Sequence, residues 1–213
     1  MEFLPIAIQH YAEQHSADEP AVLKQLARET HLKIMQPRML SGHFQGRFLS
    51  FLSKLIQPNC ILEIGTYTGY SAICLAEGLN ENGILYTIDV NEERAALIDK
   101  YIDLSGNKNK IIPLLGSALE IIPTLENKFD LVFIDADKLN YIKYFEMVID
   151  KVRSGGLIII DNVLWSGKVT EIAKKNDDET LLLQQLNMQL KKDKRVEIIL
   201  LPIRDGLSLV RKK

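Results

Sequence analysis

Short apolar runs alternate with amphipathic stretches along the chain from residue 60 onward. Most of the amphipathic stretches are roughly 10–20 residues long and place apolar residues at helical spacing. The apolar runs are the predicted strands, which cover residues 60–64, 84–90, 110–115, 129–135, 156–161, 196–201 and 206–210. Strands that alternate with helices predict parallel β-α-β units and therefore an α/β fold with a doubly wound sheet. The last two runs are joined by PIRDG, too short for a crossover helix, which predicts an antiparallel pair at one end of the sheet.

Residues 1–57 differ from the rest of the chain because they show helical spacing and no strand pattern. Pro37 marks a break within them, and the longer helical segment that follows covers residues 39–56. The apolar residues that recur there at helical spacing are Phe44, Phe48, Phe51, Leu52 and Leu55. The chain is thus predicted to be one domain, residues 1–213, with a helical N-terminal extension or lid over 1–57 and an α/β core over 58–213.

Within the core, the helical stretches carry recognisable ends and apolar stripes. Asn91 is a predicted helix cap because two glutamates follow it, and Gly106 is the matching stop signal. Two apolar stripes mark further helices, namely Tyr141, Phe145, Val148 and Ile149, and then Leu182, Leu186 and Leu190.

Composition narrows the classes of protein that the pattern allows. The 213 residues include 26 lysines and arginines against 28 aspartates and glutamates, so a phosphate-binding basic surface is not expected. The N-terminus lacks the basic and apolar regions of a signal peptide, and no apolar run approaches the ~20 residues of a membrane span. Cys60 and Cys74 lie within apolar runs, which favours core thiols and a cytoplasmic location.

The first strand of the core ends in the segment EIGTYTGYS, in which Gly65 and Gly69 allow a tight turn. Asp89 ends the next strand, where such folds often bind the two hydroxyls of a ribose. Together these features favour a nucleoside-type cofactor, although a structural turn alone also needs glycine. The spacing of the glycines is G-x-x-x-G, and the dinucleotide fingerprint that a dehydrogenase of this architecture requires is absent.

Oxygen-bearing side chains follow the fourth and fifth strands of the core. Asp135, Asp161 and Asn162 are expected to converge from neighbouring strand ends, and such ligands suit a hard cation such as Mg²⁺. Each of them taken alone also fits a helix cap or a turn. In the same way, Lys138 alone fits a solvated lysine and Trp165 a core aromatic residue.

Five segments together resemble the cation-dependent O-methyltransferases, the family that contains the caffeoyl-CoA and catechol O-methyltransferases and a branch of small bacterial enzymes. The segments are EIGTYTGYS, TIDV, GSA after the third strand, DADK and DNVLWSGK. The resemblance covers roughly residues 35–211. It implies a Rossmann-like, mostly parallel seven-stranded sheet with an antiparallel last strand. It also implies methyl transfer from S-adenosylmethionine to one hydroxyl of a catechol-like vicinal diol.

The same resemblance assigns roles to individual residues. The cofactor-binding set that it implies is Ser41, Glu63, Gly65, Thr66, Tyr67, Ser71, Asp89, Ser117, Ala118, Asp135 and Asp137. It implies Asp135, Asp161 and Asn162 as ligands of Mg²⁺, Mn²⁺ or Ca²⁺. Lys138 corresponds to the general base and a substrate contact, with Trp165 and Ser166 beside the substrate. The expected partners are an aromatic diol and a second copy of the chain, with no nucleic acid and no membrane.

The sequence also departs from the family. No lysine matches the one near the N-terminus that contacts the CoA ester in plant members, and residues 1–34 share little with them, so a CoA-thioester acceptor is not predicted. Acceptor choice is expected to depend on residues 30–45 and 165–168. A base-modifying methyltransferase usually carries N/D-P-P-Y where this chain has DADK. A non-catalytic cofactor-binding protein stays open at this point.

Overall fold

A seven-stranded mixed sheet organises the chain in a computed structural model that describes residues 5–213. The strands are β1 (Cys60–Ile64), β2 (Ile84–Asp89), β3 (Ile111–Leu115), β4 (Phe129–Ile134), β5 (Val152–Asp161), β6 (Val196–Leu201) and β7 (Leu207–Lys212). The α-helices are α1 (Ile6–Gln14), α2 (Ala21–Lys33), α3 (Gly42–Ile56), α4 (Tyr70–Ala76), α5 (Ala95–Leu104), α6 (Ala118–Thr124), α7 (Tyr141–Ile149) and α8 (Asp178–Lys192). The short 3-10 helices are η1 (Pro37–Met39), η2 (Glu92–Arg94), η3 (Lys138–Asn140) and η4 (Trp165–Thr170).

The sheet has the order β3-β2-β1-β4-β5-β7-β6, which confirms the predicted fold class. β1 pairs in parallel with both β2 and β4, so the strand order reverses between β1 and β4. β7 runs antiparallel to both β5 and β6, as the short connection between the last two strands predicted. In open α/β sheets such a reversal opens a crevice at the carboxyl ends of the strands, where ligands bind.

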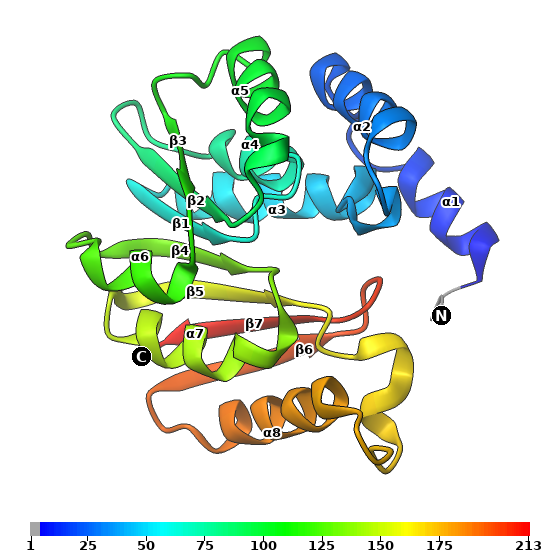
Figure 1. Cartoon of the computed structure of the whole chain (residues 1–213), viewed down its shortest axis with the longest axis vertical. Coiled ribbons are helices and arrows are strands. Elements are labelled where there is room, and N and C mark those ends of the chain that lie inside the picture. The colour runs from blue at the N-terminus through cyan, green and yellow to red at the C-terminus, as the bar shows by residue number, and fades with distance from the viewer. Residues whose placement is uncertain (1–4) are drawn as a thin grey trace.

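Helices cover both faces of the sheet and make two hydrophobic cores. Residues of α6, α7 and α8 pack on one face, and residues of α2, α3, α4 and α5 pack on the other. Figure 1 shows α2 beside α5 at the top of the view and α8 at the bottom, beside β6. Every residue of α4 is buried, because this helix lies between the sheet and α3.

α3 turns a mostly polar face toward the protein, and of its apolar stripe Phe48 and Leu52 pack partly buried against the core. The buried residues of α3 are Gln45, Gly46, Leu49, Ser50 and Ser53. Phe51 and Leu55, which the sequence pattern placed on the apolar stripe, are 62% and 66% exposed. Helical spacing identified the helix but not the side that packs on α4, because close approach to α4 requires small residues.

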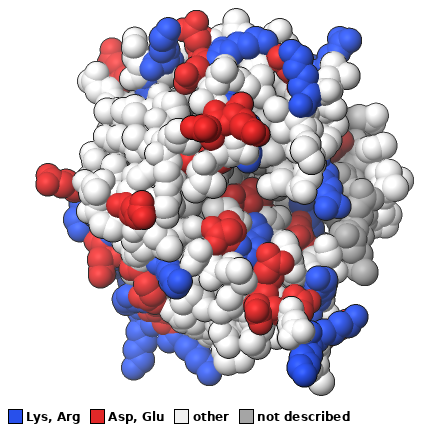
Figure 2. Space-filling view, viewed as in Figure 1, with Lys and Arg blue, Asp and Glu red and all other residues white. Residues whose placement is uncertain are grey.

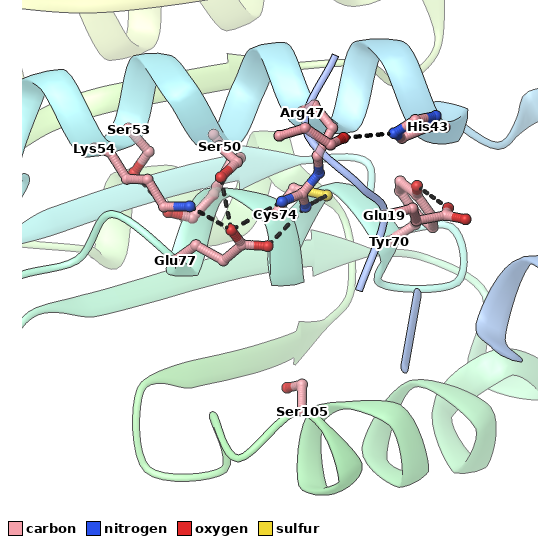
Figure 3. Close-up of polar contacts among 12 residues, drawn as sticks. Glu19, His43, Arg47, Ser50, Ser53, Lys54, Tyr70, Cys74, Glu77 and Ser105 are labelled. Carbon is pink, nitrogen blue, oxygen red and sulfur yellow. Dashed lines mark hydrogen bonds and ion pairs between the residues drawn. The ribbon is translucent and has the colours of Figure 1, made fainter. Parts of the chain in front are cut away.

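Ionic contacts hold α3 to the segment after α4. Arg47 donates two hydrogen bonds to the carboxylate of Glu77, and Ser50 and Lys54 each donate one more (Figure 3). Burial alone would raise the pKa of Glu77, but these hydrogen bonds and the Arg47 charge lower it to about 2. The carboxylate of Glu77, which accepts hydrogen bonds from three side chains of α3, therefore joins the N-terminal extension to the core.

Smaller differences from the predicted elements have local causes. β5 begins at Val152, four residues before the predicted start, and its pairing with β4 shifts register between Phe129 and Leu131. In α8 the buried leucines are Leu183, Leu186 and Leu190, so Leu183 takes the place expected for Leu182. The side chain of Asn91 accepts a hydrogen bond from the backbone N–H of Glu93, as the predicted cap requires.

Between residues 5 and 213, no helix is both long and apolar enough to cross a membrane. Residues 1–4 of the predicted N-terminal extension lie outside the described residues.

Candidate active site

A cavity of about 760 Å³ opens at the carboxyl ends of the parallel strands, beside the β1/β4 reversal. The space-filling view is hollowed near its centre, and acidic and basic residues both line the hollow (Figure 2). The predicted site residues that line the cavity are Ser41, Gly65, Tyr67, Asp89, Ala118, Asp135, Asp137, Lys138, Asp161, Asn162, Trp165 and Ser166. The predicted residues that lie outside its lining are Glu63, Thr66, Ser71 and Ser117.

The turn between β1 and α4 requires glycine at its first position. Gly65 has a φ of +103°, and a Cβ atom there would lie 1.9 Å from the backbone oxygen of Asp135. Gly69 has a φ of +87° and caps α4. The loop after β1 can therefore approach the end of β4 closely, which brings the β1–α4 turn and the DADK segment to one cavity.

Asp89 is held in place by the same turn. Its Oδ2 accepts the backbone N–H of Tyr67 at 2.8 Å, and its Oδ1 accepts the N–H of Asn91 at 2.9 Å. Arg94 lies 3.8 Å from Oδ2 and over the Tyr67 ring, and it lines the cavity although the sequence analysis assigned it no role. Each carboxylate oxygen keeps a free lone pair, so Asp89 can still accept hydrogen bonds from a ligand.

Glu63 lies fully buried behind the turn. Thr87 donates a 2.5 Å hydrogen bond to its Oε2, and the hydroxyl of Thr87 also lies 2.6 Å from that of Thr66. Burial raises the pKa of Glu63 to about 8, and the charges of Asp135 and Asp89 add to this effect. Its Oε1 has no hydrogen-bond partner among residues 5–213. Glu63 and Thr66 therefore shape the turn from behind the cavity wall.

Two carboxylates and an amide meet at the ends of β4 and β5. Burial and, to a smaller extent, the nearby charge of Asp135 raise the pKa of Asp161 to about 7. Oδ1 of Asp161 accepts the N–H of Asn162 at 2.6 Å, and Oδ2 accepts from Gln45 at 2.5 Å. A buried carboxylate beside a partly buried one, with an adjacent amide oxygen, matches the preference of a hard divalent cation. Within the described residues, no three acidic, histidine or cysteine side chains form a metal-binding group, so a cation would also depend on Asn162.

Lys138 lies beside these carboxylates and is only 8% exposed. Its Nζ donates to Asp135 Oδ1 at 3.3 Å, to the carbonyl of Ala136 at 2.9 Å and to the hydroxyl of Tyr141 at 2.6 Å. Burial raises the pKa of Tyr141 well above its ordinary value, so this phenol stays protonated. The sequence analysis placed Tyr141 in a core stripe, and helical spacing gave no sign of its contact with Lys138. Next to Lys138, Asp137 accepts hydrogen bonds from Asn140 and Tyr144.

Two loops that hydrogen-bond to each other form the part of the cavity wall that contains Trp165, whose ring centroid lies 5.9 Å from Lys138 Nζ. Figure 1 shows the yellow segment after β5 and the red turn between β6 and β7 beyond the same end of the sheet. The backbone N–H of Ser166 donates to Asp205 Oδ1, and that of Leu164 donates to the backbone oxygen of Asp205. Asn162, Trp165 and Ser166 have positive φ values. Arg204 and Asp205 line the cavity, but the sequence showed only that they lie in a short connection.

Comparison with known proteins decides the family. The model of the family described as O-methyltransferase matches residues 13–213. The chain belongs to this family. It is therefore an S-adenosylmethionine-dependent O-methyltransferase, as its motifs predicted.

Relatives and solved structures agree with this assignment. Caffeoyl-CoA O-methyltransferase of Petroselinum crispum is 37% identical over 206 residues, which is 91% of this chain and 85% of the relative. Caffeoyl-CoA O-methyltransferase 1 of Zea mays is 37% identical over 91% of this chain and 79% of its own length. The SAH-bound methyltransferase PaMTH1 of Podospora anserina superposes with a TM-score of 0.90 at 27% identity, covering 100% of this chain and 99% of that one. The O-methyltransferase of Bacillus cereus in complex with SAH gives a TM-score of 0.89 at 28% identity over 97% of both chains.

Proposed function

We propose that this O-methyltransferase moves a methyl group from S-adenosylmethionine to one hydroxyl of a catechol-like vicinal diol, and that the transfer needs a divalent cation. The observation that carries the proposal is the pair of neighbouring carboxylates, the buried Asp161 and the partly buried Asp135, next to Asn162 and Lys138 in the cavity. Two like charges at one site repel each other, and a divalent cation would relieve that repulsion. Mg²⁺ is the first candidate, with Mn²⁺ and Ca²⁺ as alternatives.

The cofactor would occupy the part of the cavity that lies between the β1–α4 turn and the end of β2. Asp89 would accept hydrogen bonds from the ribose hydroxyls, and Ala118 would border the adenine. Ser41, Gly65 and Tyr67 line the cavity and would contact the methionine part, with Ser71, Glu63 and Thr66 supporting the turn from behind. Ser117 is the N-cap residue of α6 and directly precedes Ala118. S-adenosylmethionine carries the methyl group on a sulfonium, a good leaving group for an in-line displacement.

Residues of the chain would orient the acceptor and manage its proton. A divalent cation held by Asp135, Asp161 and Asn162 would make a diol hydroxyl more acidic and fix its orientation. Lys138 Nζ now donates three hydrogen bonds as an ammonium, so it would first release one of its protons to solvent, and the neutral amine would then take the proton from that hydroxyl. Tyr141 would keep Nζ in position while this happens. Trp165 and Ser166, which line the cavity beside Lys138, would bound the acceptor ring.

Residues from the N-terminal extension support its role as a lid. Gln36, Arg38, Met39 and Ser41 line the cavity, although they precede the α/β core in the chain. They would exclude water from the reacting groups when cofactor and acceptor are bound. The relatives named caffeoyl-CoA O-methyltransferase make a phenylpropanoid diol a reasonable first acceptor to test.

The experiment compares methyl transfer from labelled S-adenosylmethionine to catechol and to its monophenol analogue, with and without EDTA. We expect transfer to catechol only, loss of that transfer in EDTA, and its recovery when Mg²⁺ or Mn²⁺ is added in excess. Binding of S-adenosylhomocysteine, measured by calorimetry in EDTA, is the control for an intact cofactor site. Equal rates on both acceptors, or full activity after exhaustive chelation, would contradict the proposal.

We also propose a homodimer formed through α3 and the edge of the sheet. Phe51 and Leu55 on α3 are largely exposed, and Ile199 on edge strand β6 is exposed as well. Ile199 points to the same sheet face as Leu201, which packs in the core that contains α3. A second copy of the chain would cover this apolar surface. A cytoplasmic location is proposed from the two cysteines, which are both free and buried.

A further inference from the structure

Gln45 reaches from α3 of the N-terminal extension to the end of β5. Its side chain is 1% exposed, and its Nε2 donates a 2.5 Å hydrogen bond to Oδ2 of Asp161, which is 116 residues away in the chain. The other carboxylate oxygen of Asp161 accepts the backbone N–H of Asn162. Each oxygen of Asp161 thus has one protein donor, which fixes the plane of the carboxylate and leaves lone pairs free.

Arg204, from the turn between β6 and β7, binds the opposite end of the same amide. Its Nη1 lies 3.4 Å from Oε1 of Gln45 and 3.2 Å from the backbone oxygen of Leu40. A guanidinium can only donate and a carboxylate can only accept, so these two partners together dictate which end of the amide faces Asp161. The three residues form one chain of hydrogen bonds from Arg204 through Gln45 to Asp161.

The backbone of Gln45 is held firmly by close packing of α3 against α4. A Cβ atom at Gly46 would lie 2.6 Å from Cε1 of Tyr70 and 2.9 Å from Sγ of Cys74, so no larger residue fits there without displacement. Arg47 and Ser50 of α3 also both donate hydrogen bonds to Glu77, the residue that follows α4 (Figure 3). Gln45 therefore projects toward Asp161 from a fixed base.

A neutral amide suits this position for an electrostatic reason. A lysine or arginine in direct contact with Asp161 would neutralise its charge and compete with a cation for the same oxygen. A glutamine orients the carboxylate by a hydrogen bond and leaves its negative charge available. Partners of this kind beyond the ligands themselves are worth about 10–100-fold in metal affinity.

We infer that Gln45 is a positioning residue for Asp161, and that Arg204 sets the orientation of the Gln45 amide. The N-terminal extension and the β6–β7 turn then both determine the affinity of the site for a divalent cation. This inference rests on the proposed cation site, and it assigns a function to two residues that lie outside the set of ligands.

The test measures Mg²⁺ affinity by calorimetry in the presence of saturating S-adenosylhomocysteine, for the wild type, Gln45→Met, Arg204→Met and the double variant. Methionine has nearly the length of glutamine but cannot donate to a carboxylate. Ser50→Ala is the matched control, because it removes a hydrogen bond from α3 to a different carboxylate, that of Glu77. Affinity for S-adenosylhomocysteine in EDTA, measured for every variant, reports on the fold of the cofactor site.

We expect Gln45→Met to weaken Mg²⁺ binding by about 10–100-fold while its affinity for S-adenosylhomocysteine changes less than about twofold. Arg204→Met should give a smaller loss, and the double variant should bind Mg²⁺ no more weakly than Gln45→Met, because both residues act through one contact. Ser50→Ala should keep wild-type Mg²⁺ affinity. Should Gln45→Met fail to fold, Gln45→Asn, which is one methylene too short to reach Asp161, is measured in its place.

Different results would overturn different claims. Unchanged Mg²⁺ affinity in the Gln45 variant, with binding by the wild type, would refute the positioning role and leave the cation site intact. Equal losses in Gln45→Met and Ser50→Ala would show a general effect of loosening α3, and would also refute it. No saturable Mg²⁺ binding by the wild type would refute the cation site itself, and the inference with it.

Discussion

At the scale of single residues, the cavity combines residues that belong to recognisable sequence motifs with contacting residues that no motif marks. Lys138 and Asp135 belong to DADK, and their proximity follows from a spacing of three residues. Tyr141 lies three residues after Lys138 and outside the DADK segment, yet its hydroxyl accepts a 2.6 Å hydrogen bond from Lys138. The buried hydroxyl of Tyr141 thus restricts the position of Lys138 Nζ, because it accepts a hydrogen bond at a fixed point.

Replacing Lys138 tests its part in the reaction. Lys138→Met should lower kcat by about 10²–10⁴-fold with binding of S-adenosylhomocysteine retained, as expected for the loss of a proton acceptor. Tyr141→Phe should give a smaller loss, because it removes one contact of Nζ and leaves the amine. The control is Lys143→Met, an exposed lysine of α7 that contacts Asn140 and not the carboxylates. The kcat of each variant is measured at steady state with catechol and Mg²⁺. A normal kcat for Lys138→Met would show that Lys138 is not the proton acceptor.

Asp89 offers a second test at the same scale. Asp89→Asn should weaken binding of S-adenosylmethionine by about one to two decades, since hydrogen bonds to a charged group contribute about 1.5–3 kcal/mol. The amide NH₂ would also face one of the two backbone N–H groups, of Tyr67 or Asn91, that the carboxylate now accepts. Asp103→Asn, at an exposed carboxylate on α5, is the control. Calorimetric affinities within twofold of the wild type would exclude Asp89 from the cofactor site.

At the scale of elements, α3 shows why a helix can be predicted while its orientation is not. Phe51 and Leu55 of its apolar stripe are exposed, yet the buried face contains four small or polar residues beside Leu49, namely Gln45, Gly46, Ser50 and Ser53. α4 approaches so closely at Gly46 that a Cβ atom there would lie 2.6 Å from Cε1 of Tyr70. The polar residues are satisfied there by Asp161, by Glu77 and by the backbone oxygen of Leu75.

The contact between α3 and Glu77 should make stability depend on pH. The pKa of Glu77 is about 2 in the folded protein because of Arg47, Lys54 and Ser50, against 4.5 as the ordinary value. A carboxylate with a lowered folded pKa stabilises the protein above its unfolded pKa and loses that contribution as pH falls. Wild type should therefore exceed Glu77→Gln by about 1–3 kcal/mol in free energy of unfolding at pH 7, with the gap narrowing from pH 4.5 toward pH 2.

Urea unfolding followed by circular dichroism at several pH values measures this gap. Glu197→Gln serves as the matched control, because Glu197 pairs with Arg211 on the surface, where both side chains are more than half exposed. It should change the free energy of unfolding by less than about 1 kcal/mol at every pH. A Glu77→Gln difference that does not vary with pH would mean that the carboxylate charge is not the source of the stabilisation.

At the scale of the whole molecule, the apolar surface on α3 and β6 predicts association. Light scattering after size exclusion should give twice the 24.2 kDa mass of one chain for the wild type and the mass of one chain for Phe51→Glu. A charge placed in the centre of an apolar interface opposes association because it must lose its water. Met188→Glu places the same charge at an exposed apolar position on α8 and should stay a dimer. A wild type of single-chain mass would refute the proposed homodimer.

The local pattern of the sequence determined the sheet and most of the cofactor turn. Apolar runs of strand length became β1 to β7 with small changes at their ends, because the central strands β1, β4 and β5 bury mostly apolar residues, while the edge strands β3 and β6 bury only part of theirs. Gly65 and Asp89 lie at the strand ends where parallel pairing must bring them together. That Asp135, Asp161 and Asn162 line the same cavity could be predicted from the sequence for the same reason.

Only the tertiary structure decided which polar residues support those groups. Gln45 contacts Asp161 across 116 positions of the chain, and Arg204 contacts Gln45 across 159. In the sequence Gln45 is one polar residue within an amphipathic helix, and Arg204 lies in a short connection. Their contacts depend on the rotation of α3 about its axis and on the path of the β6–β7 turn. Both are set by the packing of side chains that are distant in the chain, and local periodicity carries no information about that packing.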